Sequence, residues 1–240
     1  MFLFALSLFA IANAATCQDF FFDFGANAGL VFRTIYEPDS VPNAELAEEF
    51  KRLFGGVKRR RRCVSTYAFE ADWRYTETLI NLEKECRAQS WNALVFTETK
   101  VGVRSGPATF DEPVRTDLLT HHNLREIDVS EIIGNLTSRR HQESVVVVKM
   151  DIEGREYLVL PRMFELGYLC REKIDALMIA WHDSLAIEPE YEPAKEFQEK
   201  FSAFLSTQEC ESTQIIAIDD DVTESYQSSR ISDTRDSQSK

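Results

Sequence analysis

Acidic side chains and one histidine recur in this chain at the points where apolar runs end. Carboxylates and imidazoles are the groups that position hydroxyls, bind hard cations or exchange protons. In an α/β protein, the carboxyl end of a strand is also the place where ligands bind. The residues in such positions are Asp23, Glu70, Asp151, Glu153 and His182.

The first of these positions opens a glycine-rich turn, DFGANAG, which runs from Asp23 to Gly29. Glycines after a first strand let the backbone approach a ligand closely. Pyrophosphate sites use G-x-G-x-x-G, whereas here Asn27 replaces the middle glycine and Asp23 would repel a phosphate. Gly25 and Ala26 come directly after this acid-bearing strand end. The acid therefore makes a ligand with an ammonium or hydroxyl group more suitable than a phosphate. The alternative is a turn that serves packing alone.

Glu70 closes the second apolar run and is followed by Ala71. An acid at the end of the second strand of such a fold can accept hydrogen bonds from the two hydroxyls of a ribose. A glutamate at a strand end is common, so this position alone is a weak signal. Together with the glycine-rich turn after the first strand, it favours a ligand that contains adenosine.

Asp151 and Glu153 follow the run VVVVKM and lie on one face of an extended segment. Such a pair can position a substrate hydroxyl, bind a metal or act as a base. Alternatively, one acid caps the next helix and the other is solvated. His182 can move a proton or ligate a metal, although a single histidine is often a hydrogen-bonded packing residue. We take Asp151 and His182 as catalytic candidates and Glu153 as a substrate-positioning candidate; no third metal ligand stands out.

The spacing of apolar residues predicts the elements that carry these positions. Buried strands are expected at 19–24, 63–69, 91–97, 145–151, 174–181 and 213–218. Helices are expected at 30–36, 44–54, 73–87, 155–166 and 194–205, with a helical turn or two near 129–133. This alternation predicts an α/β fold whose parallel sheet is covered by helices on both faces.

Composition excludes some classes of function. The chain has 240 residues, 44% of them hydrophobic, which predicts a globular domain at 15–218. Its net charge of −13 disfavours nucleic-acid binding, because phosphates need a clustered positive field. The basic run KRRRR at 58–62 is interpreted as a solvated loop, or alternatively as a proteolytic or anion-binding site. Residues 219–240 are almost devoid of apolar side chains and are expected to be disordered.

Residues 1–14 have the pattern of a short secretory signal. Mostly apolar residues lead into Ala12-Asn13-Ala14, the small-x-small pattern that signal peptidase accepts. The run is too short to span a bilayer. We therefore expect a secreted protein or one in the secretory pathway, with no stable membrane span. If these residues instead form a core helix, the protein is expected to be cytoplasmic.

Two further features bear on the compartment. Asn135 begins an N-glycosylation triplet in a polar segment. The five cysteines, at positions 17, 63, 86, 170 and 210, are too few and too scattered to predict a disulfide framework, and none has C-x-x-C spacing. Because their number is odd, at least one stays unpaired within the chain. Cysteine usage therefore does not decide the compartment.

Four segments, in this order, resemble the FkbM-type family of S-adenosylmethionine-dependent methyltransferases. They are DFGANAG, YAFEAD, VKMDIEGREYLVL and IAWH, which lie between residues 20 and 182. The resemblance implies a Rossmann-like class I methyltransferase fold with a mostly parallel, seven-stranded sheet, although only one strand is recognisable after the fifth. It also implies S-adenosylmethionine as cofactor and O-methylation of a small hydroxylated acceptor, such as a sugar or a glycan.

The resemblance implies roles for single residues as well. The DFGANAG turn would hold the methionine part of the cofactor, with Asp23 near its amino group. Glu70 would bind the ribose hydroxyls. The cofactor-binding residues implied in this way are Asp23, Gly25, Ala26, Asn27, Gly29, Glu70 and Ala71.

The acceptor hydroxyl would be oriented or deprotonated by Asp151, with His182 as the second candidate. Two other classes of protein stay open. One is a non-catalytic secreted protein with a decayed methyltransferase fold. The other is a nicotinamide-dependent oxidoreductase, against which the absence of G-x-G-x-x-G argues.

Overall fold

The computed structural model describes residues 17–41, 44–107, 124–137, 140–141, 143–182 and 194–218. The expected signal segment at 1–14 and the expected polar tail at 219–240 lie outside these residues.

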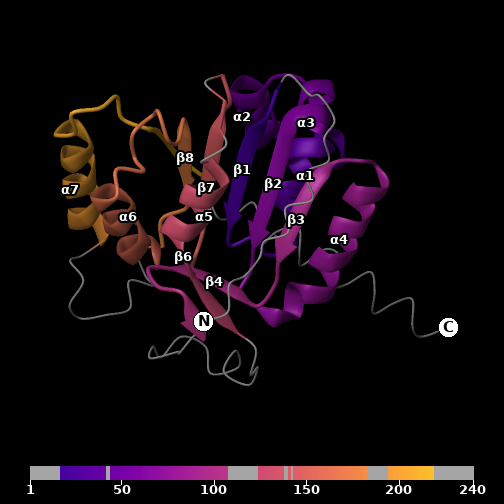
Figure 1. Cartoon of the computed structure of the whole chain (residues 1–240), viewed down its shortest axis with the longest axis horizontal. Helices are drawn as coiled ribbons and strands as arrows, with labels where there is room; N and C mark the ends of the chain where they lie inside the picture. The colour runs from indigo at the N-terminus through magenta and orange to yellow at the C-terminus, as the bar shows by residue number, and fades with distance from the viewer. Residues whose placement is uncertain are drawn as a thin grey trace.

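A six-stranded, all-parallel sheet forms the centre of the described chain (Figure 1). Its strand order is β3-β2-β1-β7-β8-β9, so the order reverses between β1 and β7. The strands are β1 (Asp19–Phe24), β2 (Val64–Phe69), β3 (Asn92–Phe96), β7 (Val146–Met150), β8 (Ala176–Ile179) and β9 (Gln214–Ala217). The α/β prediction is confirmed, whereas the expected seventh strand of this sheet is not among the described residues.

The three central strands are buried along their whole length. Their sequences, DFFFDF, VSTYAF and VVVKM, are rich in aromatic and β-branched residues, which pack well on a pleated surface. A parallel strand with helices on both faces carries apolar residues in succession rather than in alternation. The prediction of a central strand from the four valines is thus confirmed.

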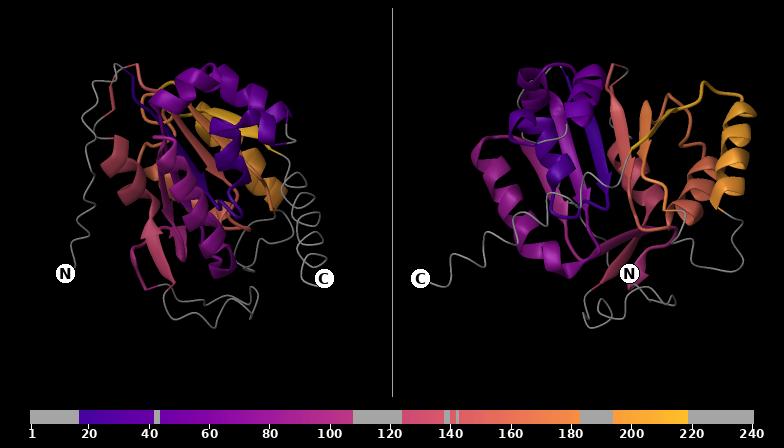
Figure 2. Two further views of the ribbon diagram at one scale, coloured as in Figure 1. Left: turned by 90° about the vertical axis from the view of Figure 1, so that its right-hand side faces the viewer. Right: turned by 180° about the vertical axis from the view of Figure 1, so that it is seen from behind.

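Helices cover both faces of the sheet, as the sequence predicts. One face is packed by α1 (Leu30–Tyr36), α2 (Ala44–Phe54), α3 (Val57–Cys63) and α4 (Thr76–Ala88). The other is packed by α5 (Val129–Thr137), α6 (Glu156–Glu165) and α7 (Ala194–Ser206). In Figure 1 and Figure 2, α1 to α4 (indigo to magenta) lie toward one end of the sheet, and α6 and α7 (orange to yellow) lie toward the other. Right-handed crossovers explain this division, because strands are added in opposite directions on the two sides of β1. Two short 3₁₀ turns, Pro38–Ser40 and Trp73–Tyr75, complete the helical segments.

Each face of the sheet has its own hydrophobic core, and β1 contributes to both. Phe21 packs edge-on against Phe50 of α2, with ring centroids 5.1 Å apart. Phe22 points to the other core, where it stacks on Tyr67 at 5.5 Å. Because side chains alternate along a strand, Asp23 shares the face of Phe21 and lies on the side of α1 and α4.

A second, three-stranded sheet lies beside the carboxyl ends of the central strands. It has the order β4-β6-β5 and consists of β4 (Thr99–Gly102), β5 (Gly106–Pro107) and β6 (Arg125–Asp128). It begins next to the end of β2, where the Thr99 amide donates to the Glu70 carbonyl oxygen at 2.8 Å. In Figure 1 its labelled strands lie below the central sheet, at the edge where ligands are expected.

The basic run at 58–62 is not a loop, which corrects the sequence interpretation. It forms α3, and Arg60 is only 2% exposed. Arg60 Nε donates to the carbonyl oxygen of Ile35 at 2.8 Å, and the Arg61 guanidinium lies 5.0 Å from the centroid of the Trp91 ring. Charge alone suggested a solvated segment, but a long arginine stem can be buried where backbone carbonyls accept its hydrogens.

Four of the five cysteines form two disulfide bonds, a pairing that the sequence leaves open. Cys17 is bonded to Cys63 and Cys170 to Cys210, with Cα–Cα distances of 5.4 and 5.7 Å. Cys86 is free and buried. The partners lie 46 and 40 residues apart in the sequence, so their proximity depends on the fold and is invisible in the spacing.

None of the helices in the described part of the chain combines the length and apolar character needed to cross a membrane. This agrees with the expectation of no membrane span for these residues.

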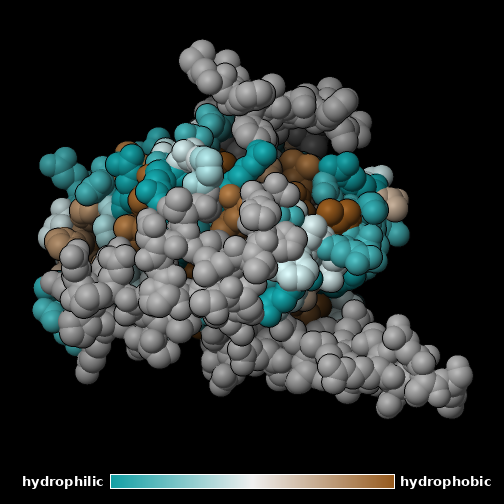
Figure 3. All heavy atoms as spheres, turned by 90° about the horizontal axis from the view of Figure 1, so that it is seen from below, coloured by the Kyte–Doolittle hydropathy of each residue, from teal (hydrophilic) through white to brown (hydrophobic). Residues whose placement is uncertain are grey.

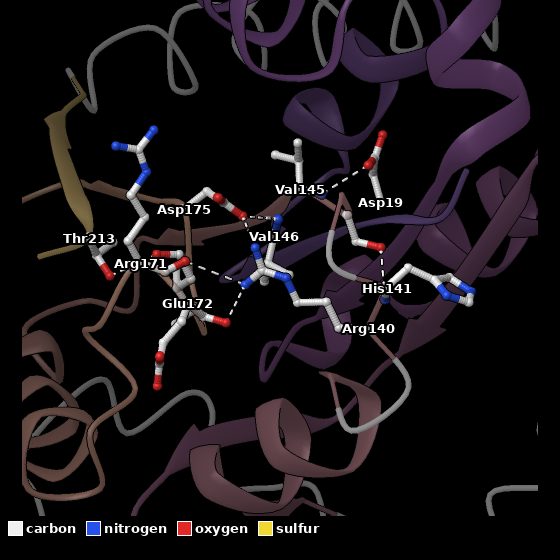
Figure 4. A network of polar contacts seen from close by, with 11 residues as sticks. Asp19, Arg140, His141, Val145, Val146, Arg171, Glu172, Asp175 and Thr213 are labelled. Carbon is white, nitrogen blue, oxygen red and sulfur yellow. Dashed lines mark hydrogen bonds and ion pairs between the residues drawn. The ribbon is translucent and has the colours of Figure 1, made fainter. Parts of the chain in front are cut away.

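At the amino ends of the strands, two acids join neighbouring segments (Figure 4). Asp19 accepts a hydrogen bond from the Val145 amide at 2.9 Å, and its other carboxylate oxygen pairs with Arg59. Asp175 accepts one from the Val146 amide at 2.8 Å and one from Arg140 at 2.9 Å. We call these contacts the amino-end network. It fixes the start of β7 at the edge opposite to the candidate site.

Candidate functional site

The carboxyl ends of β1, β2, β7 and β8 bring the sequence-predicted residues to one edge of the sheet. β1 and β7 are direct neighbours: Phe24 pairs with Met150, and the Asp151 amide donates to the Phe24 carbonyl oxygen at 3.0 Å. The strand order reverses between these two strands, which is where doubly wound sheets bind ligands. Residues from four separate segments of the sequence therefore lie together.

The DFGANAG turn depends on glycine at two positions. Gly25 has φ +79° and Gly29 has φ +78°, a region that other residues rarely adopt. A Cβ atom on Gly25 would also overlap the carbonyl oxygen of Asp151, and one on Gly29 would overlap a methyl group of Leu82 in α4. The packing interpretation of these glycines therefore has direct support, and their contact with a ligand stays a prediction.

Glu70 is buried and held by the backbone. The Asn27 amide donates to Glu70 Oε2 at 2.6 Å, and the Asp72 amide donates to Oε1 at 2.7 Å. Burial raises the pKa of Glu70 to about 7, although the two amide hydrogen bonds oppose the shift. The carboxyl group is thus oriented against the glycine-rich turn, and each oxygen retains a lone pair for another donor. The neighbouring Ala71 is half-buried.

Asp23 lies inside the protein, opposite Lys149 of β7 in the register of the sheet, and is 0% exposed. Lys149 Nζ lies 3.2 Å from Asp23 Oδ1 and donates to the Gly25 carbonyl oxygen at 2.7 Å. Oδ2 of Asp23 has no hydrogen-bond partner among the described residues, whereas Oδ1 has the ammonium of Lys149. Burial raises the pKa of Asp23, and the charge of Lys149 opposes that shift. Its position near a cofactor amino group stays a prediction.

Asp151 is held between two cations. Its Oδ2 lies 2.8 Å from Lys149 Nζ, and its Oδ1 lies 3.4 Å from His182 Nε2. Burial alone would lower the pKa of Lys149, but Asp23 and Asp151 raise it above its ordinary value, so the ammonium stays charged. Asp151 therefore has a fixed orientation at the junction of β1, β7 and β8.

His182 follows β8 and faces carboxylates through both ring nitrogens. Its Nδ1 lies 2.9 Å from Glu156 Oε1, while its Nε2 faces Asp151. Burial alone would lower the pKa of His182, but Glu156, Asp151 and Glu153 raise it to about 9. At neutral pH the imidazole is therefore charged, so it can donate a proton but cannot accept one.

Two predicted residues lie away from this charged cluster. Glu153 is exposed in the turn before α6, with φ +56°. Its negative charge contributes to the raised pKa of His182. Asn135 is exposed on α5, as expected of a glycosylation acceptor, whose use stays a prediction.

Sequence reasoning assigned no role to Lys149 or Glu156, which complete the cluster. Both lie in VKMDIEGRE, the segment that also contains the catalytic candidate Asp151. One signal was available: a lysine inside a run of buried valines needs a partner charge, because an unpaired buried charge is very costly. No comparable signal identifies Glu156, since acids in a first helical turn are common.

A cavity found in the structure lies away from this edge. It has a volume of about 300 Å³ and lies between α1 and α4, where Tyr36, Cys86 and Trp91 are among the lining residues. None of the candidate site residues lines it. Among the described residues, no group of three or more His, Cys, Asp or Glu side chains could hold a metal ion. Seen from the side of the carboxyl ends, the coloured surface mixes hydrophilic and hydrophobic residues without one dominant patch (Figure 3).

Comparisons with protein-family profiles, with curated proteins and with solved structures find no match to this chain. The resemblance to the FkbM-type family therefore depends on the four sequence segments alone. The fold assignment depends on the sheet topology described above.

Proposed function

We propose that this protein is an S-adenosylmethionine-dependent methyltransferase that acts on a hydroxyl group of a sugar or another small molecule. The observation that carries the proposal is the meeting of the DFGANAG turn with Glu70 and Asp151 where the strand order reverses. The residues that favour a nucleoside ligand and the acid that favours a hydroxylated acceptor thus lie side by side. They lie at the position where this fold class binds ligands.

The end of β2 fits the ribose of the cofactor. Two backbone amides orient the Glu70 carboxyl group, and hydroxyl donors from a ribose would stabilise its ionised form. Asp23 fits the cofactor amino group less directly, because it is fully buried beside Lys149. Its Oδ2 nevertheless has no hydrogen-bond partner among the described residues, which is unusual for a buried acid and is consistent with a missing donor.

A bound S-adenosylmethionine, held by the DFGANAG turn and Glu70, would supply an electrophilic methyl group to the acceptor oxygen, and its sulfur would keep the electron pair of the C–S bond. Positioning of the acceptor supplies much of the rate of such an in-line displacement. Asp151 accepts the hydrogen bond of the acceptor hydroxyl and takes its proton as that oxygen becomes bonded to carbon. Lys149 and the charged His182 hold Asp151 in place, and His182 is unsuited to be the base.

A nicotinamide-dependent oxidoreductase is the second candidate, and one observation favours it. Six parallel strands in the order found here also form the dinucleotide-binding sheet. The turn argues against this candidate, because Asn27 occupies the place of the middle glycine and Asp23 precedes the turn. A protein with this fold and neither ligand would be the non-catalytic alternative.

The disulfide bonds support a location in the secretory pathway. Disulfides persist in oxidising compartments and are rare in the cytosol. Both bonds here join segments of the folded domain, Cys17 with Cys63 and Cys170 with Cys210. Within the proposal, the acceptor is therefore a hydroxylated small molecule or a glycan of that compartment. The net charge of −13 does not favour a nucleic acid.

Titration calorimetry with S-adenosylmethionine and with NAD tests the proposal, followed by transfer of a labelled methyl group to a panel of sugars and other hydroxylated compounds. We expect S-adenosylmethionine alone to bind. Asp151→Asn should preserve that binding and lower transfer by about 100-fold or more, because it removes the proton acceptor. Asp175→Asn, in the amino-end network, is the control and should preserve transfer. Binding of NAD, binding of neither ligand, or undiminished transfer by Asp151→Asn would each contradict the proposal.

A further inference from the structure

A fully buried glutamate that the proposed chemistry does not use lies behind His182. Glu156 is the first residue of α6 and is 0% exposed. Its Oε1 accepts a hydrogen bond from the Ile152 amide at 2.7 Å and lies 2.9 Å from His182 Nδ1. The carboxylate is thus anchored to the backbone just before the helix, and the amino end of the helix favours its negative charge.

The geometry around His182 determines the number of hydrogens on its ring. Nδ1 faces Glu156 and Nε2 faces Asp151, so each nitrogen meets a carboxylate oxygen. A carboxylate accepts hydrogen bonds, and only the imidazolium form carries a hydrogen on both nitrogens. The arrangement therefore favours a charged ring independently of any titration argument.

Among the described residues, two further charged groups act on the ring or on its partner Asp151. Glu153, in the turn between β7 and α6, adds a negative charge that acts on His182. Lys149 lies on the far side of Asp151, where it contacts the other carboxylate oxygen. The ring thus contacts Glu156 from α6 and Asp151 from the end of β7, while Glu153 acts on it through its charge.

We propose that Glu156 is a positioning residue: it keeps His182 in the doubly protonated form, so that His182 forms an ion pair with Asp151 and fixes the carboxylate that receives the acceptor hydroxyl. The catalytic meaning of this inference depends on the proposed function, whereas the contact itself is part of the fold. Asp151 is then clamped at one oxygen by His182 and at the other by Lys149. Glu156 acts on the reaction only through His182.

This arrangement has a defined pH dependence. The pKa of His182 is raised to about 9 in the folded protein, against about 6.5 in the unfolded chain. The native state therefore holds the proton more tightly, and the resulting stabilisation is complete below pH 6.5 and is lost as the pH rises through 9. Methyl transfer should decline as the pH rises through about 9, where the folded protein loses the proton of His182, whereas a histidine acting as the base would give a rate that rises with pH.

The decisive experiment is an NMR titration of the histidine ring protons in the full chain without any ligand. The chain has four histidines, so a His182→Gln spectrum assigns the signal. We expect His182 to titrate near pH 9 in the wild type. Glu156→Gln keeps the shape of the side chain and should lower this midpoint by about 1–2 pH units, since an adjacent opposite charge shifts a pKa by that amount. Glu153→Gln, the matched control, removes a more distant charge and should lower it by less.

An unchanged midpoint in Glu156→Gln, or a shift no larger than that in Glu153→Gln, would overturn the inference. If Glu156→Gln does not fold, ¹⁵N chemical shifts of wild-type His182 at pH 7.5 decide instead: an imidazolium supports the inference and a neutral ring refutes it. None of these measurements needs a cofactor or an acceptor. A normal titration in a protein that binds no S-adenosylmethionine would therefore reject the proposed function and leave the Glu156 contact standing.

Discussion

Buried acids at the two edges of the central sheet differ in their hydrogen-bond partners. In the amino-end network, Asp19 is fully buried, and its two oxygens meet the Val145 amide and Arg59. At the carboxyl edge, Asp23 is equally buried, but within the described residues its Oδ1 has only the ammonium of Lys149 and its Oδ2 has no hydrogen-bond partner. Both acids belong to β1 and lie four residues apart on the same face.

The comparison separates a structural role from a functional one. Buried polar groups in proteins are almost always hydrogen-bonded, and exceptions need an explanation. Asp19 needs none, because an amide and a guanidinium complete its contacts. Asp23 and Glu156 each have an oxygen without a hydrogen-bond donor among the described residues, and both lie at the ligand edge. We propose that a bound ligand supplies the hydrogen-bond donor that these oxygens at the carboxyl edge lack.

Removing the cation from each edge should give the largest difference in unfolding free energy between the two edges. Lys149→Met leaves Asp23 and Asp151 without their shared charge, and loss of one partner of a buried pair costs about 3–5 kcal/mol. Arg59→Met leaves Asp19 with the Val145 amide, so the loss should be about 2 kcal/mol. Urea unfolding of both variants measures the two values. Equal losses would show that the two edges are energetically alike.

Glycine substitutions test how closely the carboxyl edge is packed. Gly25→Ala meets both an unfavourable φ and the carbonyl oxygen of Asp151, so we expect a loss of about 3 kcal/mol. Gly167→Ala has the same sign of φ, +69°, but no atom within 4 Å of the added Cβ, so its loss should be about 1 kcal/mol. Thermal or urea unfolding compares them. A Gly25→Ala variant as stable as Gly167→Ala would mean that β1 and β7 are not this close.

The smallest expected effect is a change in ligand affinity, which should differ between variants at the two edges. Glu70→Gln should weaken S-adenosylmethionine about tenfold, because a neutral amide replaces a charge-assisted acceptor for ribose hydroxyls. Asp19→Asn, at the other edge, should reduce stability and leave the affinity unchanged. Calorimetry on both variants tells them apart. Weaker binding in Asp19→Asn alone would reverse the roles assigned to the two edges.

Much of this fold is visible in the sequence because its strands are local patterns. The runs at 19–24 and 145–151 predict buried central strands, and the structure has β1 and β7 there. The edge at which the candidates lie follows from the same reasoning, because parallel strands all end on one side. The Gly25 and Gly29 positions also follow from the sequence, although the structure ties them first to backbone conformation and packing.

The features that the sequence does not reveal depend on distant partners. Arg60 is buried because carbonyl oxygens at the end of α1 and before α3 accept its hydrogens, whereas its sequence neighbourhood is typical of a solvated segment. The disulfides join cysteines 40 or more residues apart. Glu156 matters only because the end of β8 brings His182 against it. Such contacts exist once the sheet is assembled, and no local periodicity encodes them.

The place of β1 at the centre of the sheet has a consequence for how the chain is made. Its first partner, β2, follows soon in the sequence, but its second, β7, is well over a hundred residues further along. During synthesis from the amino end, one side of a phenylalanine-rich strand therefore stays unpaired until most of the domain has emerged. An open apolar strand edge invites pairing with other chains, and inward-pointing charges are a common protection. β1 carries two such inward-pointing charges, Asp19 and Asp23, within its phenylalanine-rich sequence.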